Sequence, residues 1–255
     1  MRKGRVVLVT QVQHFVGEPA VKALLEAGAK VVAQDDAFGD AATRKAWEET
    51  HPGAIAVGDL EPGAIVAAAV AAAGRLDAVV SNDAYPAVKG AVDEADPEEF
   101  RRGIEAMMVR PFMLAGAAVR QMKAQAAEGA QETEGSQGGG SILFVTSAST
   151  VHGIPNYSMY VAARAGTNGL AVTLSKELAR HGISVNALAP NFVESPTYFP
   201  PSLMADPKTR DKILSNIPLR RLGRPEEVAA AITFLVSGDS DFLTGQVIPI
   251  AGGWA

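Results

Sequence analysis

Three side chains in the second half of this 255-residue chain could together handle a proton on a hydroxyl group. Ser147 follows an apolar run, and Tyr160 and Arg164 stand four residues apart in a helical pattern. That spacing places the phenol and the guanidinium on one helix face. A phenol titrates near pH ~10, so it is a poor base at neutral pH unless a cation stabilises the phenolate. The pattern predicts a base, its cationic partner, and a hydroxyl that holds the substrate oxygen.

The same three residues also have an ordinary structural interpretation. A serine on a strand, with a Tyr and an Arg on a solvated helix, needs no catalytic role, and short motifs of this kind match by chance. The composition narrows the choice, because the chain has no cysteine and so no thiol catalysis, disulfide or Cys-ligated zinc. The position of the three residues in the fold therefore carries more weight than their spacing alone.

Short β-branched runs alternate with longer helical patterns along the whole chain. Strands that are apolar throughout are buried on both faces. The alternation predicts an α/β fold in which a doubly wound, Rossmann-like parallel sheet of about seven strands is flanked by helices. Ligands in such folds bind beyond the carboxyl ends of the strands. The expected strands are Arg5–Val9, Lys30–Gln34, Ala54–Val57, Leu76–Ser81, Ser141–Thr146, Ser184–Leu188 and Gln246–Ile250. The expected helices are Gly17–Ala27, Ala41–Glu49, Pro62–Ala73, Pro97–Gln125, Met159–Arg180 and Arg224–Val236.

Composition and charge set the class of protein. The hydrophobic fraction of 47% and the charged fraction of 20% are ordinary for a globular chain. We expect a single domain over residues 1–255. The net charge of -5 argues against nucleic acid or an anionic membrane surface as a partner. No stretch reaches the ~18 apolar residues of a membrane span, and the lack of cysteine fits a cytoplasmic location.

Two segments differ in composition from the rest of the chain. Gln125 to Gly140 is a polar, low-complexity stretch that we expect to form a solvated loop. Pro190 to Asp206 is rich in Pro, Ser and aromatic residues, and it follows a predicted strand. A loop at that place in the fold would cover a substrate site, although its proline content also fits a plain surface loop.

The loop after the first strand lacks two glycines that a dinucleotide site requires. Such a site uses one glycine for the tight turn, one for close approach to the pyrophosphate, and one for helix packing. Only the last is present, as Gly17, while Gln11 and Phe15 occupy the other two positions. A phenyl ring at Phe15 would collide with the pyrophosphate.

Acidic residues after the second and third strands give the opposite indication. Asp35 and Asp36 lie near the usual position of a ribose-binding acid, and Asp59 could flank an adenine. Aspartates at strand ends also cap turns, which explains them without a cofactor. We give the steric effect of Phe15 more weight than these acids.

The residues described so far resemble the short-chain dehydrogenase/reductase superfamily nearly end to end. Ser147, Tyr160 and Arg164 match the spacing of its catalytic Ser-Tyr-Lys, with Arg in place of Lys. Ser81 to Ala84 stands where the family has Asn-Asn-Ala-Gly, and Asn186 to Asn191 resembles its Asn-x-x-x-Pro-Gly. The segments Leu243 to Val247 and Gly252-Gly253 match its closing motif, with Ala251 at the usual Asp and Met107 at the helix Asn.

The departures resemble one branch of that superfamily, the halohydrin (haloalcohol) dehalogenases, which work without a cofactor. That branch pairs Ser-x12-Tyr-x3-Arg with a first loop of the form Thr-x4-Phe-x-Gly, and Thr10, Phe15 and Gly17 fit the second pattern. Asp83 matches the acid beside its catalytic Arg, and Arg110-Pro111-Phe112 resembles the same branch.

The resemblance implies a reaction and its residues. Tyr160 would deprotonate a vicinal haloalcohol, Ser147 would hold its oxygen, and Asp83 would orient Arg164. The products would be an epoxide, a halide ion and a proton, and the reverse reaction would accept azide, cyanide or nitrite. No metal or dinucleotide would be needed. The halide would lie where a nicotinamide lies in reductases, between Phe15, Pro190, Asn191, Phe192 and Val193, with the backbone N–H groups of Phe192 and Val193 as donors. The expected pocket walls are Tyr85, Ile154, Tyr157, Tyr198, Phe199 and Trp254.

Two other functions stay open at this point. One is an NAD(P)-dependent reductase with a degenerate cofactor loop, which Asp35, Asp36 and Asp59 favour. The other is a non-catalytic binding or scaffold protein, which would not need the intact set of Ser147, Tyr160 and Arg164. The family further implies a homotetramer, in which the two longest helices pack as interfaces between subunits.

Overall fold

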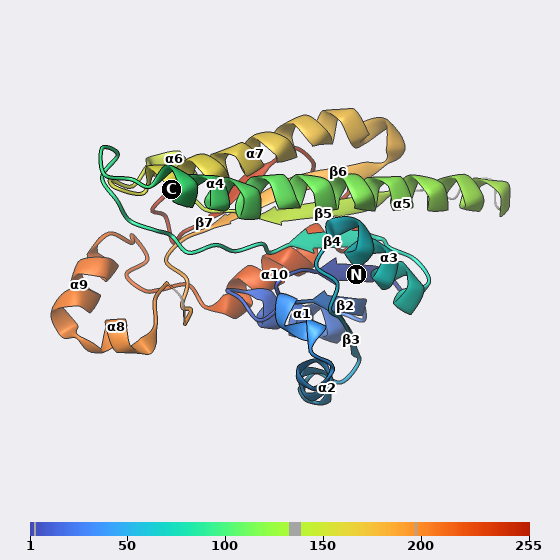
Figure 1. The fold of residues 1–255 in the computed structure, drawn as a ribbon, viewed down its shortest axis with the longest axis horizontal. Helices are drawn as coiled ribbons and strands as arrows, with labels where there is room; N and C mark the ends of the chain where they lie inside the picture. Colours follow the sequence, from blue (N-terminus) through green and yellow to red (C-terminus); the bar gives the residue numbers. More distant parts are fainter. Residues whose placement is uncertain (3, 133–138, 197) are drawn as a thin grey trace.

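The computed structural model describes residues 1–2, 4–132, 139–196 and 198–255, and it contains one seven-stranded parallel sheet (Figure 1). The strand order is β3-β2-β1-β4-β5-β6-β7, which confirms the doubly wound α/β fold expected from the sequence. Every pair of neighbouring strands is parallel. The strands are β1 (Val6–Val9), β2 (Lys30–Gln34), β3 (Ala54–Val57), β4 (Ala78–Ser81), β5 (Gly140–Val145), β6 (Ile183–Pro190) and β7 (Val247–Ile250).

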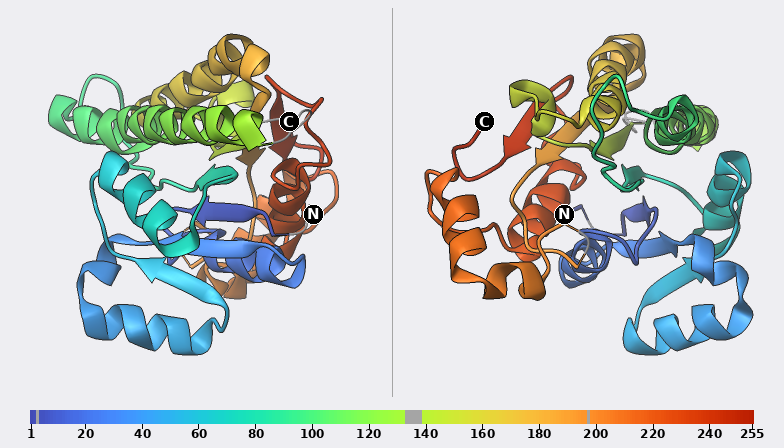
Figure 2. Two further views of the ribbon diagram at one scale, coloured as in Figure 1. Left: turned by 90° about the vertical axis from the view of Figure 1, so that its right-hand side faces the viewer. Right: turned by 60° about the vertical axis from the view of Figure 1, so that its left-hand side comes forward.

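The helices cover both faces of the sheet. Successive side chains of a strand point to opposite faces, and because these strands are largely apolar, both faces are apolar and must be covered. On one face Val7 and Val9 pack with residues of α1, α2 and α10. On the other face Val6 and Leu8 pack with residues of α3, α5 and α7, and Figures 1 and 2 show the long α5 and α7 lying together. The helices are α1 (Gly17–Glu26), α2 (Ala41–Thr50), α3 (Pro62–Ala73), α4 (Pro97–Ile104), α5 (Arg110–Glu132), α6 (Ser149–His152), α7 (Ser158–Leu178), α8 (Pro201–Ala205), α9 (Pro207–Ser215) and α10 (Pro225–Leu235). Short 3-10 turns span Asp36–Gly39 and Ala179–His181.

The helix expected over Pro97–Gln125 differs from the prediction at two places. A π-helical turn at Glu105–Val109 separates α4 from α5, and the carbonyl of Met107 in this turn accepts a hydrogen bond from Thr167 Oγ1 at 2.5 Å. The helix also continues through the first part of the expected polar loop to Glu132, because alanine, glutamine and glutamate are good helix formers. Residues 133–138 of that loop lie outside the described residues.

The carboxyl ends of the strands meet at one edge of the sheet. Thr10 follows β1, Asn82 follows β4, Thr146 follows β5, and Pro190 ends β6. Residues far apart in the sequence therefore converge at this edge. Between β1 and β4 the order in which the strands follow one another along the sheet reverses, and the crevice at such a point is the usual ligand position in this fold.

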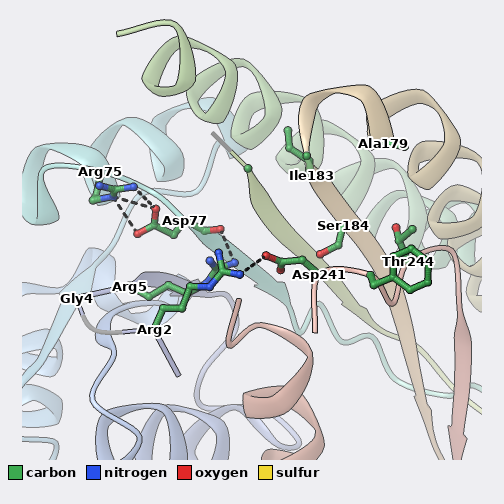
Figure 3. Close-up of a pocket in the computed structure, with 13 residues that line it drawn as sticks. Arg2, Gly4, Arg5, Arg75, Asp77, Ala179, Ile183, Ser184, Asp241 and Thr244 are labelled. Carbon is green, nitrogen blue, oxygen red and sulfur yellow. Dashed lines mark hydrogen bonds and ion pairs between the residues drawn. The ribbon is translucent and has the colours of Figure 1, made fainter. Parts of the chain in front are cut away.

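The opposite, amino-terminal edge is held together by charged side chains (Figure 3). The Asp77 carboxylate accepts from the Val6 N–H at 2.8 Å and from Arg75 Nη2 at 2.7 Å. The buried Arg5 donates through Nη2 to Ser141 Oγ at 2.6 Å and to the Asp77 carbonyl at 3.3 Å. These contacts tie β1 to β4 and β5.

Every helix among the described residues is too short or too polar to cross a bilayer.

The Asp77→Ala variant is expected to lower the free energy of unfolding by about 2–4 kcal/mol. The buried Val6 N–H would lose its acceptor, and Arg5 would lose a nearby counter-charge. Urea denaturation of both proteins measures the difference. Asp239→Ala is the control, because this exposed carboxylate pairs with the chain's amino group at the surface and should change the unfolding midpoint very little. Equal effects of the two substitutions would contradict this account of the edge.

Candidate functional site

A cavity of about 480 Å³ opens at the carboxyl edge of the sheet. It is lined by Ser147, Tyr160 and Arg164, which the sequence predicted to act together, and by aromatic side chains from the loop after β6. Among the described lining residues Arg164 is the one that carries a permanent charge, so the cavity favours an anion. The remaining lining residues are Phe15, Ala87, Thr146, Ser149, Gly153, Ile154, Pro155, Tyr157, Pro190, Asn191, Phe192, Val193, Tyr198, Phe199, Asn216 and Trp254.

Ser147 is held in place by a second serine that the sequence analysis missed. Ser147 is buried beyond the end of β5, and its Oγ lies 2.8 Å from the Oγ of Ser149. The Ser149 N–H, in the first turn of α6, donates to the same Oγ at 3.2 Å. The hydroxyl of Ser147 is thus oriented before any substrate binds. The only sequence signal for Ser149 was its position two residues after Ser147.

Arg164 is a buried cation whose position is fixed by the sheet. It is 4% exposed, and its Nη1 donates to the carbonyl of Asp83 at 3.0 Å and to the carbonyl of Val145 at 2.9 Å. Its Cζ lies 5.5 Å from the centroid of the Tyr160 ring, one helical turn earlier on α7. Burial alone would lower the pKa of Arg164, but the phenols of Tyr160 and Tyr198 and the Asp83 carboxylate raise it overall. The guanidinium therefore stays charged beside Tyr160.

Asp83 contacts Arg164 differently from the expected carboxylate pairing. Its backbone carbonyl accepts the Arg164 hydrogen bond, while its carboxylate accepts from the hydroxyls of Ser81 and Thr10. The nearest ion pair of the carboxylate is with Arg110 Nε, at 3.6 Å from Oδ1. Burial raises the pKa of the Asp83 carboxyl, against the lowering effects of Ser81, Arg110 and Arg164. Asp83 thus acts on Arg164 through its backbone and its charge at a distance.

Tyr198 brings a second phenol to the site. It is close enough to Tyr160 and Arg164 for both to affect its ionisation, and its ring meets Phe15 edge to face with centroids 5.5 Å apart. Burial and the Tyr160 phenol raise the pKa of Tyr198 to about 12. The Tyr198 phenol therefore stays protonated at neutral pH.

The loop after β6 offers a different set of donors from the one expected. The Phe192 N–H donates to the side chain of its neighbour, Asn191 Oδ1, at 2.8 Å, so it is not free for an anion. The Nδ2 of Asn191 is buried and has no hydrogen-bond partner in the part of the chain that the structure describes. Within the described residues the Val193 N–H also donates to no protein acceptor. The Val193 N–H is thus the one of the two expected donors that stays available, and Asn191 Nδ2 takes the place of the Phe192 N–H.

The loop after β1 keeps the backbone shape of a glycine-rich turn but carries large side chains. Gln11 and Phe15 have φ values of 50° and 48°, in the left-handed region that glycine adopts most easily. Asn82 Nδ2 holds the loop by donating to the carbonyls of Gln11 and His14. Asp35 is buried and accepts from the N–H groups of Gln13 and Ala37, so it caps the turn.

Most of the expected pocket walls line the cavity. Ile154, Tyr157, Tyr198, Phe199 and Trp254 all do so. Tyr85 does not line this cavity. It lines a different cavity, together with Asp83 and Arg110. Asn216, at the end of α9, was not expected at the site and had no recognisable sequence signal. Among the described residues no group of three or more His, Asp or Glu side chains is placed to hold a metal ion.

Comparisons with known proteins fall into two groups. A family model described as enoyl-(acyl carrier protein) reductase matches residues 13–255. A curated protein of Thermotoga maritima, named only as an uncharacterized oxidoreductase, is 33% identical over 98% of this chain and 97% of its own. A solved structure described as a dehalogenation enzyme is 43% identical, with a TM-score of 0.90 and coverage of 99% of both chains. Another, a halohydrin dehalogenase bound to ethyl (2S)-oxiran-2-ylacetate, is 37% identical, with a TM-score of 0.88 and coverage of 97% of this chain and 96% of that one.

The raised pKa of Tyr198 predicts a pH dependence of stability. An unfolded tyrosine titrates near pH ~10, so the folded state holds this proton more tightly. The stability that results is present below pH ~10 and is lost as the pH rises toward about 12. In urea denaturation between pH 8 and 11, the Tyr198→Phe variant should therefore lose about 1 kcal/mol less stability than the wild type. Identical slopes for the two proteins would show that Tyr198 titrates normally.

Proposed function

Because the chain belongs to the short-chain dehydrogenase/reductase superfamily but closes the cofactor loop of that fold with Phe15, we propose that it is a cofactor-independent halohydrin dehalogenase. The proposed reaction converts a vicinal haloalcohol into an epoxide, a halide ion and a proton, and runs in reverse with halide or another small anion. The observation that carries the proposal is the Phe15 side chain at the catalytic cavity. The likeness to two dehalogenase structures supports it.

The residues of the first loop do not fit a bound dinucleotide, the cofactor expected for most members of this superfamily. A pyrophosphate needs close approach to the backbone at the positions of Gln11 and Phe15. Here Gln11 is buried, and the Phe15 ring packs edge to face against Tyr198 in the cavity that Ser147 and Tyr160 also line. Asp35, the acid nearest to a ribose-binding position, is already used by two backbone N–H groups.

The proposed chemistry uses three side chains in one step. Tyr160, as its phenolate beside Arg164, takes the hydroxyl proton, while Ser147 donates a hydrogen bond that holds the same oxygen. The oxygen's electron pair forms a bond to the adjacent carbon, and the carbon–halogen bond breaks with its electron pair leaving as halide. The proton then passes from Tyr160 to solvent. Because both reacting atoms belong to one substrate, alignment in the cavity supplies much of the rate.

The two phenols of the site have different roles under this proposal. Arg164 can stabilise one phenolate next to it, and a second negative charge at Tyr198 would be opposed by its burial and by Tyr160. Tyr160 is the base because it shares the helix face with Arg164. Tyr198 stays protonated, and with Phe15 it forms the wall between the cavity and the first loop.

The departing halide is proposed to bind at the loop after β6. Asn191 Nδ2 and the Val193 N–H are donors that find no protein acceptor among the described residues, and Arg164 supplies a positive charge to the same cavity. Phe15, Pro190 and Phe192 surround these donors with apolar surface, which strengthens a hydrogen bond to an anion. The same position would bind azide, cyanide or nitrite for ring opening.

An NAD(P)-dependent oxidoreductase is the alternative that the curated relatives favour. It would require Phe15 and Tyr198 to move apart to admit a cofactor.

A homotetramer remains part of the proposal as well. The exposed Phe112 and Met113 on α5 and Val172 on α7 are apolar surface that would suit the expected interfaces.

Halide release from a short bromohydrin tests the proposal directly. The purified protein, with no added cofactor, should release bromide, and Tyr160→Phe should lower the rate by about 10²–10⁴-fold because the general base is lost. Tyr157→Phe is the matched control, since it removes a hydroxyl from the same cavity without touching the proposed base. Saturable binding of NAD(H) or NADP(H) at micromolar levels, without bromide release, would favour the oxidoreductase instead.

The proposed halide position makes a separate prediction. Asn191→Asp should weaken bromide binding more than tenfold, because a buried amide donor is replaced by a group that repels anions. Bromide titration followed by tryptophan fluorescence measures the effect, since Trp254 lines the cavity. Asn216→Asp, which changes an amide in the same cavity away from this loop, is the control. Unaltered bromide affinity in Asn191→Asp would place the anion elsewhere.

A further inference from the structure

We propose that a second, apolar cavity beside the catalytic one is a binding site for the alkyl tail of the substrate, and that Phe199 is the partition between them. This inference rests on the proposed function for the identity of the substrate, but not for the existence of the site. The second cavity has a volume of about 610 Å³. Phe199 is the one described residue that lines both cavities.

The second cavity lies between the loop after β6, the helices α8 and α9, and the start of α10. Its apolar surface comes mainly from Met204 on α8, Leu214 on α9, and Leu222 and Pro225 before and in α10. Met204 and Leu214 are only half-buried, so their side chains have surface left to cover. A tail that entered here would bury that surface together with its own.

Glu194, Arg210 and Arg221 are the charged residues that line this cavity, and each of the two arginines is paired with a carboxylate beside it. Arg221 makes two hydrogen bonds of 2.7 Å to the Glu227 carboxylate, and Arg210 lies 3.5 Å from Asp211. Neither guanidinium is therefore left to attract an anionic ligand. The chemistry that fits is an uncharged linear alkyl chain, attached to a head group held by Ser147 and Tyr160.

Phe199 can serve as a partition because its backbone and its ring are held independently. Its N–H donates to the Ser195 carbonyl at 3.2 Å, and the Ser195 Oγ accepts from the Tyr198 N–H at 2.9 Å. The ring, by contrast, is held by packing, with its centroid 5.5 Å from that of Phe192. A rotation of the side chain leaves the backbone bonds intact. Phe199 thereby sets the length of tail that the wild-type cavity accepts.

Binding of unreactive diols tests the site without relying on turnover. A series of linear 1,2-alkanediols keeps the hydroxyl of the substrate and carries a second hydroxyl in place of the halogen, so these diols have no halide to lose. Each methylene buried in an apolar site should improve affinity about fourfold. In the wild type this gain should stop at the length that reaches Phe199. In Phe199→Ala it should continue for two or more further methylenes, measured as dissociation constants by calorimetry.

Two further variants distinguish two explanations of a longer accepted tail: a connection between the catalytic cavity and the second cavity, or an enlargement of the catalytic cavity alone. Adding Leu214→Trp to Phe199→Ala should fill the second cavity and cancel the gain for long diols, while short diols bind as before. Trp254→Ala removes an aromatic wall that lines the catalytic cavity alone, and it should give no gain for long diols. If Trp254→Ala lengthens the accepted tail as much as Phe199→Ala, or if Leu214→Trp changes nothing, the tail site is wrong. Failure of bromide release with these diol results intact would overturn the proposed reaction and leave the site standing.

Discussion

The two hydrogen bonds from Arg164 to backbone carbonyls are the constraint on which the site depends. A buried guanidinium must find acceptors, and here the acceptors are the carbonyls of Asp83 and Val145, beyond β4 and at the end of β5. These bonds fix α7 against the carboxyl edge of the sheet, and with it Tyr160, one turn earlier on the same face. Ser147 follows Val145 by two residues, so its distance from Tyr160 is set by the same contact. The guanidinium beside the Tyr160 ring is therefore also the anchor of the helix that carries Tyr160.

The sheet and most helices follow from the sequence because their signals are local. Apolar β-branched runs and helical periodicity depend on neighbours within a few residues. The convergence of Ser147, Tyr160 and Arg164 could also be predicted, since strand ends in a parallel sheet share one edge. The π-helical turn at Glu105–Val109 could not, because the Thr167 hydroxyl that bonds to its Met107 carbonyl lies some sixty residues away in the chain.

The hydrogen-bond partners within the site were the least predictable part. The sequence places Asp83 near Arg164 but cannot say whether its carboxylate or its carbonyl makes the contact, and the nearby Arg110 takes the carboxylate. Asn191 shows the same limit, because its amide oxygen accepts from the next residue's N–H while its amide nitrogen has no acceptor among the described residues. Tyr85 was expected to line the catalytic cavity, yet it lines a different cavity together with Asp83. Each outcome depends on side-chain rotamers and on competition between neighbours.

The left-handed backbone at Gln11 and Phe15 has a consequence for substitution of these residues. Both occupy positions where a dinucleotide loop has glycine, and both keep a backbone conformation that disfavours other residues by about 1–2 kcal/mol. Glycine adopts the same left-handed region readily, so a change to glycine at either position would remove the side chain without requiring a different backbone conformation. Whether this loop is open or filled therefore depends on its side chains and not on the path of its backbone.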